Sequence, residues 1–200
     1  MNIFNKSKKV SFYKTNDPSQ RKHHMYSAGI LPYQIVNKKV YFLLGKDNNG
    51  FWSDFGGKCD PRDENNIKET ASREFYEESF GSVLGLQSIK NMLQNSKNYK
   101  LINSESMGGI TYYMFIMRVP MRTETTRDRF NKTLEYMKYI NADFQYREKV
   151  DINWISLDTL LLCVKSDEKN AMRLGWPLKK VFKKTLLLCK KEIYELKHTT

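Results

Sequence analysis

Two apolar runs near the start of the chain predict a pair of antiparallel strands. They extend over residues 26–36 and residues 40–46, and the polar residues 37–39 separate them. Short runs rich in β-branched and aromatic residues, joined by a few polar residues, are typical of a β-hairpin. We therefore expect the ordered domain to open with a hairpin.

The spacing of apolar residues then changes from strand-like to helical. Ile67, Ala71 and Phe75 follow one another at intervals of four, which places them on one face of an α-helix. We predict a helix over residues 65–80 whose apolar stripe packs on a sheet.

Cap signals lie at both ends of this predicted helix. Asp63 or Asn65 is a suitable N-cap, because both side chains accept hydrogen bonds from free backbone N–H groups. Gly81 is a suitable stop signal, since glycine adopts the left-handed conformation in which many helices end.

The remaining pattern alternates between strands and helices. Strand-like runs occur at residues 83–89, 110–119 and 150–155, and a helix is expected over residues 128–140. Residues 178–197 predict one C-terminal amphipathic helix, with apolar positions on one side and lysines on the other. Strands interleaved with helices indicate an α/β fold around a mixed sheet.

Composition favours one domain with a short extension. Residues 1–25 are polar and basic, and we expect them to precede a single domain over residues 26–200. No run of eighteen apolar residues occurs, and the first residues lack the apolar stretch of a signal peptide. We therefore expect a cytoplasmic protein without a membrane partner. Three dispersed cysteines, Cys59, Cys163 and Cys189, show no metal-binding spacing.

The charge of the chain favours phosphorylated partners. The net charge is +12, from 34 basic and 22 acidic residues. A surplus of this sign attracts polyanions such as nucleotides, inositol phosphates or RNA. The lysines are spread along the chain, however, so a lysine-rich composition alone would also produce the surplus.

Three glutamates share one face of the predicted helix. Glu74, Glu77 and Glu78 stand at i, i+3 and i+4, and carboxylates this close repel one another. Mg²⁺ would compensate their charge, since it prefers oxygen ligands from a few carboxylates together with substrate phosphates. Arg73 lies four residues from both Glu69 and Glu77 and is placed to hold the array in register. A solvated acidic helix face would show the same spacing.

Paired glycines precede this helix and strengthen the case for a site. Gly56 and Gly57 follow an aromatic run and lead into Lys58. Glycine lets the backbone approach a ligand closely, as phosphate-binding loops require. A lysine adds a point charge for phosphate oxygens. We expect these three residues to form a substrate loop.

Residues 57–81 resemble the Nudix box, whose pattern is G-x5-E-x7-R-E-U-x-E-E-x-G-U, with U a bulky aliphatic residue. Its Arg-Glu and Glu-Glu core is matched at residues 73–78. Residues 26–46 and 52–58 resemble the family's opening strands and its W-x-x-P-G-G-K stretch, and residues 150–158 resemble its late strand and turn. The resemblance implies a Nudix-type α/β/α sandwich with a mixed central sheet and the box helix packed against it.

The chain departs from this pattern at the edges of the box. Gly57 lies sixteen residues before Arg73 where the pattern has fourteen, so the loop is two residues longer. Glu64 lies nine residues before Arg73 instead of eight, and its match to the first box glutamate is open. Gly81 comes one residue late, and Phe55 replaces the usual proline. The spacing of the helix glutamates is intact.

The resemblance implies a hydrolase that uses Mg²⁺, or Mn²⁺, to direct water at one phosphorus of a diphosphate linkage. It makes Glu74, Glu77 and Glu78 the metal ligands and, together with Arg73, the catalytic residues of the site. Arg73 would orient these carboxylates, and Gly57 would provide the turn of the loop.

The resemblance leaves the general base open, because in this family the base comes from the box or from a loop elsewhere. Glu105, Glu124 and Glu148 are the candidates outside the box, the first because it precedes a pair of glycines in a predicted loop. Each would have to come within hydrogen-bond reach of the attacking water.

Three functions are consistent with these residues. The first is hydrolysis of a nucleoside diphosphate derivative or a similar phosphorylated molecule. The second is removal of the cap from RNA 5′ ends, which the basic charge favours. The third is a catalytically inactive Nudix-fold module that binds RNA or a nucleotide. The intact glutamates argue against the third function, and the irregular loop argues for it.

Overall fold

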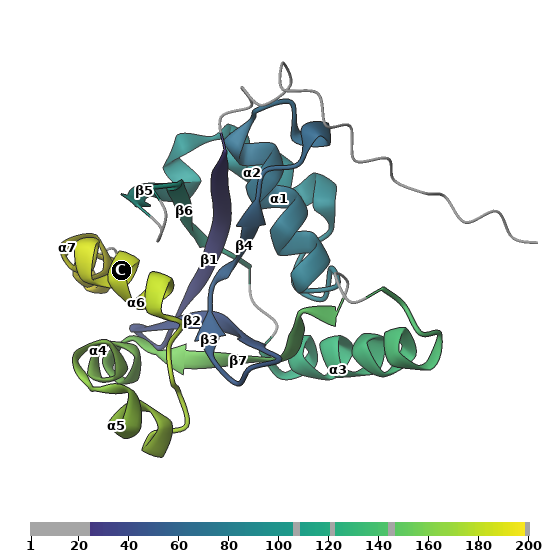
Figure 1. Ribbon diagram of the computed structural model, residues 1–200. Helices are drawn as coiled ribbons and strands as arrows, with labels where there is room; N and C mark the ends of the chain where they lie inside the picture. Colours follow the sequence, from purple (N-terminus) through teal and green to yellow (C-terminus); the bar gives the residue numbers. More distant parts are fainter. Residues whose placement is uncertain (1–24, 106–108, 121–122, 144–146, 199–200) are drawn as a thin grey trace, which may run out of the picture.

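A seven-stranded mixed sheet with helices on both faces forms the centre of the molecule (Figure 1). The structure is a computed structural model that describes residues 25–105, 109–120, 123–143 and 147–198. Nearly all of the expected N-terminal extension lies outside these residues. The expected α/β fold class, with a mixed central sheet, is confirmed. Among the described helices, none combines the length and the apolar content needed to cross a membrane.

The strands, in chain order, are β1 (Tyr26–Val36), β2 (Lys39–Asp47), β3 (Trp52–Ser53), β4 (Phe55–Lys58), β5 (Tyr99–Glu105), β6 (Thr111–Arg118) and β7 (Lys149–Ser156). The helices are α1 (Ile67–Glu78), α2 (Leu86–Gln94), α3 (Thr123–Tyr139), α4 (Leu157–Lys165), α5 (Glu168–Arg173), α6 (Lys180–Leu188) and α7 (Lys190–Glu195). Short 3-10 helices are η2 (Pro61–Asp63), η3 (Ser96–Asn98) and η5 (Leu196–His198).

The expected hairpin is confirmed as β1 and β2, which pair antiparallel. Its turn residues Asn37 and Lys38 have φ of 48° and 61°. Two positive φ values in a two-residue turn give the type I′ geometry that matches the twist of paired strands. The later strand at residues 110–119 and the one at residues 150–155 are confirmed as β6 and β7.

Strand β1 changes partners along one edge, and this change positions β4. Parallel β6 lies along the other edge of β1. On the changing edge, β4 pairs antiparallel with residues 27–30, whereas β2 pairs with residues 33–36. Strand β2 then leaves β1 and pairs with β7 and β3. The split leaves room for the two glycines of β4 beside the first half of β1.

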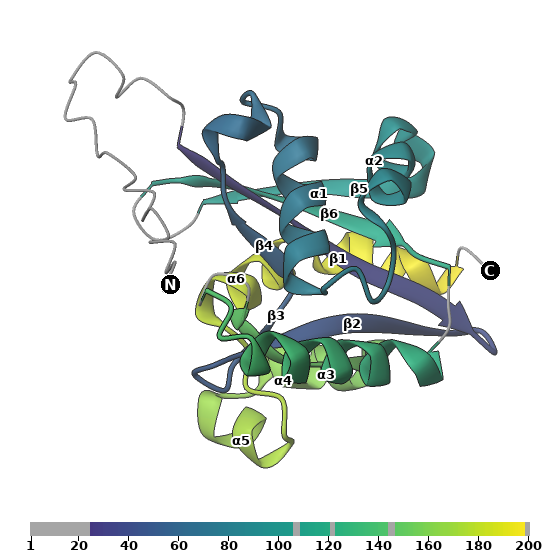
Figure 2. The ribbon, with the colours of Figure 1, turned by 90° about the vertical axis from the view of Figure 1, so that its right-hand side faces the viewer.

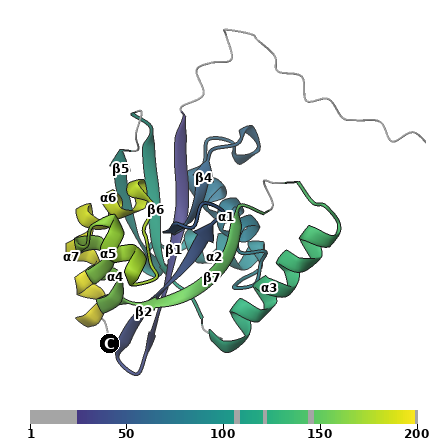
Figure 3. The same cartoon turned by 60° about the horizontal axis from the view of Figure 1, so that its bottom comes forward.

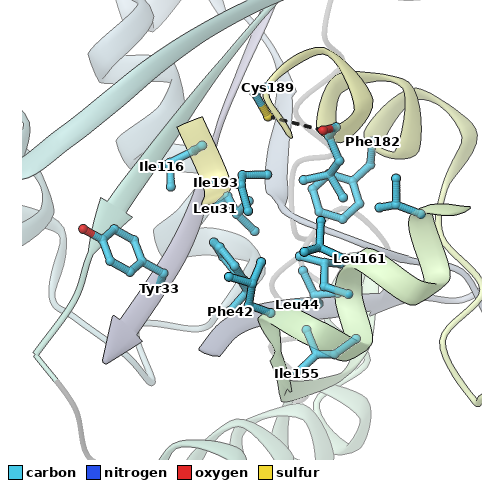
Figure 4. Packing of buried hydrophobic residues seen from close by; sticks show 14 of the residues in the cluster. Leu31, Tyr33, Phe42, Leu44, Ile116, Ile155, Leu161, Phe182, Cys189 and Ile193 are labelled. Atoms are coloured by element: carbon cyan, nitrogen blue, oxygen red, sulfur yellow. Dashed lines mark hydrogen bonds between the residues drawn. The ribbon is translucent and has the colours of Figure 1, made fainter. Parts of the chain in front are cut away.

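The two faces of the sheet bury separate hydrophobic clusters, and Figures 2 and 3 show the helices that lie on its two sides. On one face, Leu31 packs in a cluster with Phe182 and Ile193 from α6 and α7 (Figure 4). On the opposite face, Ile30 lies in a cluster with Phe75 from α1. Adjacent strand residues point to opposite faces. The box helix is therefore held against the sheet by one apolar stripe, as expected.

Two expected elements differ from the structure. Residues 83–89 are not a strand, because their second half belongs to α2, which buries Ile89 and Leu93 at helical spacing. A short apolar run does not distinguish a strand from a buried helix. The C-terminal amphipathic segment is helical but breaks at Cys189 into α6 and α7. Apolar residues on both sides of Cys189 lie in one cluster. Their periodicity therefore does not reveal the break between the two helices.

Replacing Gly29 with alanine should destabilise the fold. A Cβ atom there would collide with the backbone of Phe55 and Gly56 and with the hydroxyl of Tyr112. We expect Gly29→Ala to lower the free energy of unfolding by about 1–3 kcal/mol, measured by urea denaturation. Gly85→Ala is the matched control. Nothing lies within 4 Å of its added Cβ, and Gly85 is the N-cap of α2, so the loss should be smaller, below about 1 kcal/mol. Equal losses in both variants would contradict this account.

Candidate functional site

The glutamate helix α1 begins two residues later than expected. Asn66 is its N-cap, and the Asn66 side chain accepts a hydrogen bond from the Lys68 N–H at 3.0 Å. The expected caps, Asp63 and Asn65, are therefore wrong. Asn65 and the preceding Glu64 both have left-handed backbones, with φ of 57° and 51°. They form an exposed turn between η2 and α1.

Asp63 is the acidic partner of Arg73. The Arg73 guanidinium donates from Nε to Oδ1 at 3.0 Å and from Nη2 to Oδ2 at 2.9 Å. Asp63 is only 3% exposed and also accepts from the Thr70 hydroxyl at 2.8 Å. It lies six residues after Gly57, which is the box spacing for the first acid. Glu64, offered as that match by the sequence, is exposed, so the two extra residues follow the acid.

Arg73 also orients two of the helix glutamates, as expected. Its Nη1 donates to Glu74 Oε1 at 2.9 Å and to Glu77 Oε2 at 3.2 Å. Its Nη2 donates to the carbonyl of Lys58 at 3.0 Å. One side chain therefore connects Lys58, Asp63 and the helix face. The expectation that Gly56, Gly57 and Lys58 form a loop is wrong, because these residues belong to strand β4, which pairs with β1.

The paired glycines allow the glutamates to lie against the backbone of β4. A Cβ at Gly57 would collide with the carboxylate of Glu74. The N–H of Gly56 donates to Glu78 Oε2 at 2.8 Å. Gly57 is thus required by the close carboxylate of Glu74, and Gly56 by the close backbone of Gly29 on β1.

Glu78 is the buried end of the glutamate face. It is 8% exposed, and its Oε1 lies 3.5 Å from Lys149 Nζ. Burial raises the pKa of Glu78 to about 8. Burial, followed by the nearby charge of Glu77, raises the pKa of Glu74 to about 7. Both ionised forms therefore lack part of the positive charge that would stabilise them.

Lys149 is the functional residue that sequence reasoning missed. It is 2% exposed at the start of β7, and its Nζ donates to Asp47 Oδ1 at 2.6 Å and to Ser53 Oγ at 2.8 Å. In the sequence it is one of 34 basic residues. The one local signal is Gly45, where a Cβ would lie 2.8 Å from the Lys149 stem.

The glutamate face borders one polar cavity of roughly 540 Å³. Its lining includes all three helix glutamates and Arg73, the β4 residues Gly56, Gly57 and Lys58, and also Arg62, Glu148 and Lys179. Glu148 is thus the base candidate brought to the site. Glu105 lies at the end of β5 beside a different hollow, and the side chain of Glu124 is outside the described part of the chain.

The chemistry of the cavity fits a hard divalent cation, although its carboxylates do not converge. Within the described residues, no group of three or more His, Cys, Asp and Glu side chains is placed to hold a metal ion. Glu74 and Glu77 accept from Arg73, and Glu78 accepts from Gly56. The raised pKa values of Glu74 and Glu78 indicate a need for added positive charge. Arg73 engages one oxygen of Glu74 and one of Glu77, so ligation by all three glutamates would require their other oxygens to turn toward one point.

Solved structures show a likeness of fold. No protein-family model matches the chain, and no curated protein matches it. The C. elegans Ap4A hydrolase is similar with a TM-score of 0.44 and 14% identity, over 76% of this chain and 94% of that one. The Nudix domain of Shewanella oneidensis NrtR, solved with ADP ribose, has a TM-score of 0.47 and 14% identity, over 91% and 94%. A Nudix hydrolase from Alicyclobacillus acidocaldarius has a TM-score of 0.42 and 11% identity, over 86% and 94%.

Nudix proteins are thus among the neighbours of this fold.

The buried glutamates predict a pH dependence of stability. The folded pKa of Glu78 is about 8, and the unfolded value is about 4.3, so the folded state holds more protons between these values. Stability is therefore full below the unfolded pKa and is lost as the pH rises through the folded pKa. In metal-free buffer, we expect the free energy of unfolding to fall from pH 5 to pH 9 by an amount of order a few kcal/mol.

Urea denaturation across this pH range, with a chelator present, measures the effect. Glu78→Gln should show a smaller loss, because the amide does not titrate. Glu135→Gln, on an exposed position of α3, should keep the wild-type slope. Equal slopes in the two variants would show that Glu78 is not the titrating group.

Proposed function

We propose that the protein is a Mg²⁺-dependent hydrolase of the Nudix type that cleaves a diphosphate linkage in a nucleoside diphosphate derivative. One observation carries the proposal. The glutamate face of α1 and the paired glycines of β4 line the same polar cavity, and Arg73 connects them. A solvated acidic helix face would have no such cavity and no buried glutamate.

The distribution of charge supports a phosphorylated substrate. Carboxylates of α1 line the cavity, and the cationic side chains of Lys58, Arg62 and Lys179 line it as well. Asp60 orients Arg62, which donates from Nε to Asp60 Oδ1 at 2.8 Å and from Nη2 to Oδ2 at 3.0 Å. Cations of this kind bind the terminal oxygens of a diphosphate, while the glutamates serve the metal.

The residues of the chain have separate tasks in this mechanism. Glu74, Glu77 and Glu78 would hold the cation, which when bound neutralises phosphate charge and helps to activate water. Arg73 holds the first two carboxylates at the helix face. The Gly56 N–H fixes the third. The cationic side chains of Lys58, Arg62 and Lys179 would orient the two phosphates so that one phosphorus faces the water.

A substrate panel tests the activity. Purified protein with Mg²⁺ is incubated with nucleoside diphosphate derivatives, dinucleoside polyphosphates, diphosphoinositols and capped RNA, and the products are separated by ion-exchange chromatography. We expect metal-dependent cleavage of a nucleoside diphosphate derivative. Glu78→Gln should lower kcat/KM by about 10²–10³-fold, because a buried carboxylate of the site is lost. Glu135→Gln is the matched control and should retain wild-type rates.

The same panel separates the alternatives. Cleavage confined to capped RNA would replace the small-molecule substrate with an RNA cap. Salt-sensitive RNA binding without any turnover would identify a binding module. No cleavage of any substrate, or equal rates in Glu78→Gln and wild type, would refute the hydrolase.

Glu148 is the general-base candidate that lines the cavity. If it accepts the proton of the attacking water, Glu148→Gln should lower kcat by about 10²–10⁴-fold. Glu105→Gln should leave kcat unchanged, because Glu105 lies beside a different hollow. An unaltered kcat in Glu148→Gln would assign the base to the glutamates of α1.

A further inference from the structure

A lysine is completely buried beneath the glutamate face. The ammonium of Lys149 lies 2.6 Å from Asp47 Oδ1, 2.8 Å from Ser53 Oγ and 3.5 Å from Glu78 Oε1. These three oxygens come from β2, β3 and α1. An ammonium is a compact, strongly hydrated charge, so its burial is costly unless such oxygens replace its water.

The surrounding strands make room for this lysine. A Cβ at Gly45 on β2 would lie 2.8 Å from Lys149 Cδ and 2.9 Å from Cε, closer than side chains pack. The ring centroid of Phe55 lies 6.0 Å from the ammonium, within the range of a cation–π contact. The pairing of β2 with β7 shifts register between Lys46 and Asp47. Such irregularities re-aim side chains next to a site.

The set of groups around Lys149 resembles the surroundings of a metal ion. Two carboxylates and a hydroxyl face it, and all are hard oxygen donors of the kind that bind Mg²⁺. A third carboxylate, that of Asp54, is buried nearby and accepts a hydrogen bond from the hydroxyl of Tyr112. On this inner side of Glu78, the ammonium supplies the positive charge that a divalent cation would otherwise supply.

We propose that Lys149 is a resident cation that takes the position of a metal ion at the buried end of the glutamate face and holds Glu78 in place. Exchangeable cations then bind on the open side of the cavity, toward Glu74, Glu77 and Oε2 of Glu78, and not on the inner side of Glu78. Lys149 is a positioning residue, because it acts through Glu78. The inference deepens the proposed function, since it assumes that the glutamates bind metal.

Counting bound ions tests the proposal without turnover. Mn²⁺ is titrated into metal-free protein, and free Mn²⁺ is measured by electron paramagnetic resonance. Lys149→Met keeps the length of the side chain and removes its charge, so we expect it to bind one more Mn²⁺ per chain than wild type. Lys100→Met, which removes a surface lysine paired with Glu195, is the control and should bind the wild-type number.

Thermal unfolding provides a second readout. Without metal, Lys149→Met should melt at a lower temperature than wild type, because buried Glu78 loses its ion pair and Asp47 keeps only Lys179 as a cationic partner. Saturating Mn²⁺ should raise the melting temperature of Lys149→Met by more than it raises that of wild type. A lysine that only fills space would not produce this metal-dependent rescue. Equal Mn²⁺ numbers and equal Mn²⁺-induced shifts in the two proteins would overturn the proposal.

A double variant keeps the test decisive if Lys149→Met does not fold. Lys149→Met combined with Asp47→Asn replaces the buried ion pair with two neutral groups and leaves Glu78 ionisable. The extra Mn²⁺ is still expected there, and the wild-type number would overturn the proposal. Substrate cleavage with no extra ion in the variants refutes only the role of Lys149. An extra ion without cleavage of any substrate refutes only the hydrolase.

Discussion

The bidentate ion pair between Asp63 and Arg73 determines how the loop after β4 meets α1. Asp63 is buried, and its carboxylate is fully engaged by the guanidinium and by Thr70. Because Arg73 also holds Glu74 and Glu77, loss of this pair would leave a buried charge and release the glutamate face at once. Removal of one partner of such a pair is strongly destabilising. Stability and the geometry of the site therefore depend on the same contact.

Positive and negative side chains alternate from the opening of the cavity to the buried residues beneath it. The net charge of +12 is spread over the chain, but the cavity has carboxylates at its glutamate face and cations from the loop and from Lys179. Beneath the glutamates the sign changes again, at Lys149. Alternating layers limit the repulsion that three neighbouring carboxylates would otherwise cause. They also separate groups suited to phosphate from groups suited to a cation.

The sequence predicted the features that depend on residues close together along the chain. The hairpin turn, the apolar stripe of α1 and the shared face of its glutamates all follow from spacing along the chain. Contacts between residues far apart along the chain could not be predicted from this spacing. Asp63 and Glu64 are adjacent acids, and only the path of the turn determines which one reaches Arg73. Strand β5 has mostly exposed or half-exposed residues, so it lacks the alternation that reveals a strand.

The left-handed turn at Glu64 and Asn65 has a consequence for the length of the loop. Asp63 and Arg73 fix its two ends through space, so the number of residues between them does not set the geometry of the glutamate face. Lengthening a seven-residue connection to nine costs only about 0.2 kcal/mol of closure entropy. The loop can therefore gain or lose residues during evolution while the glutamate face keeps its position. A sequence pattern that counts residues between Asp63 and Arg73 can therefore fail even though the ion pair between them is present.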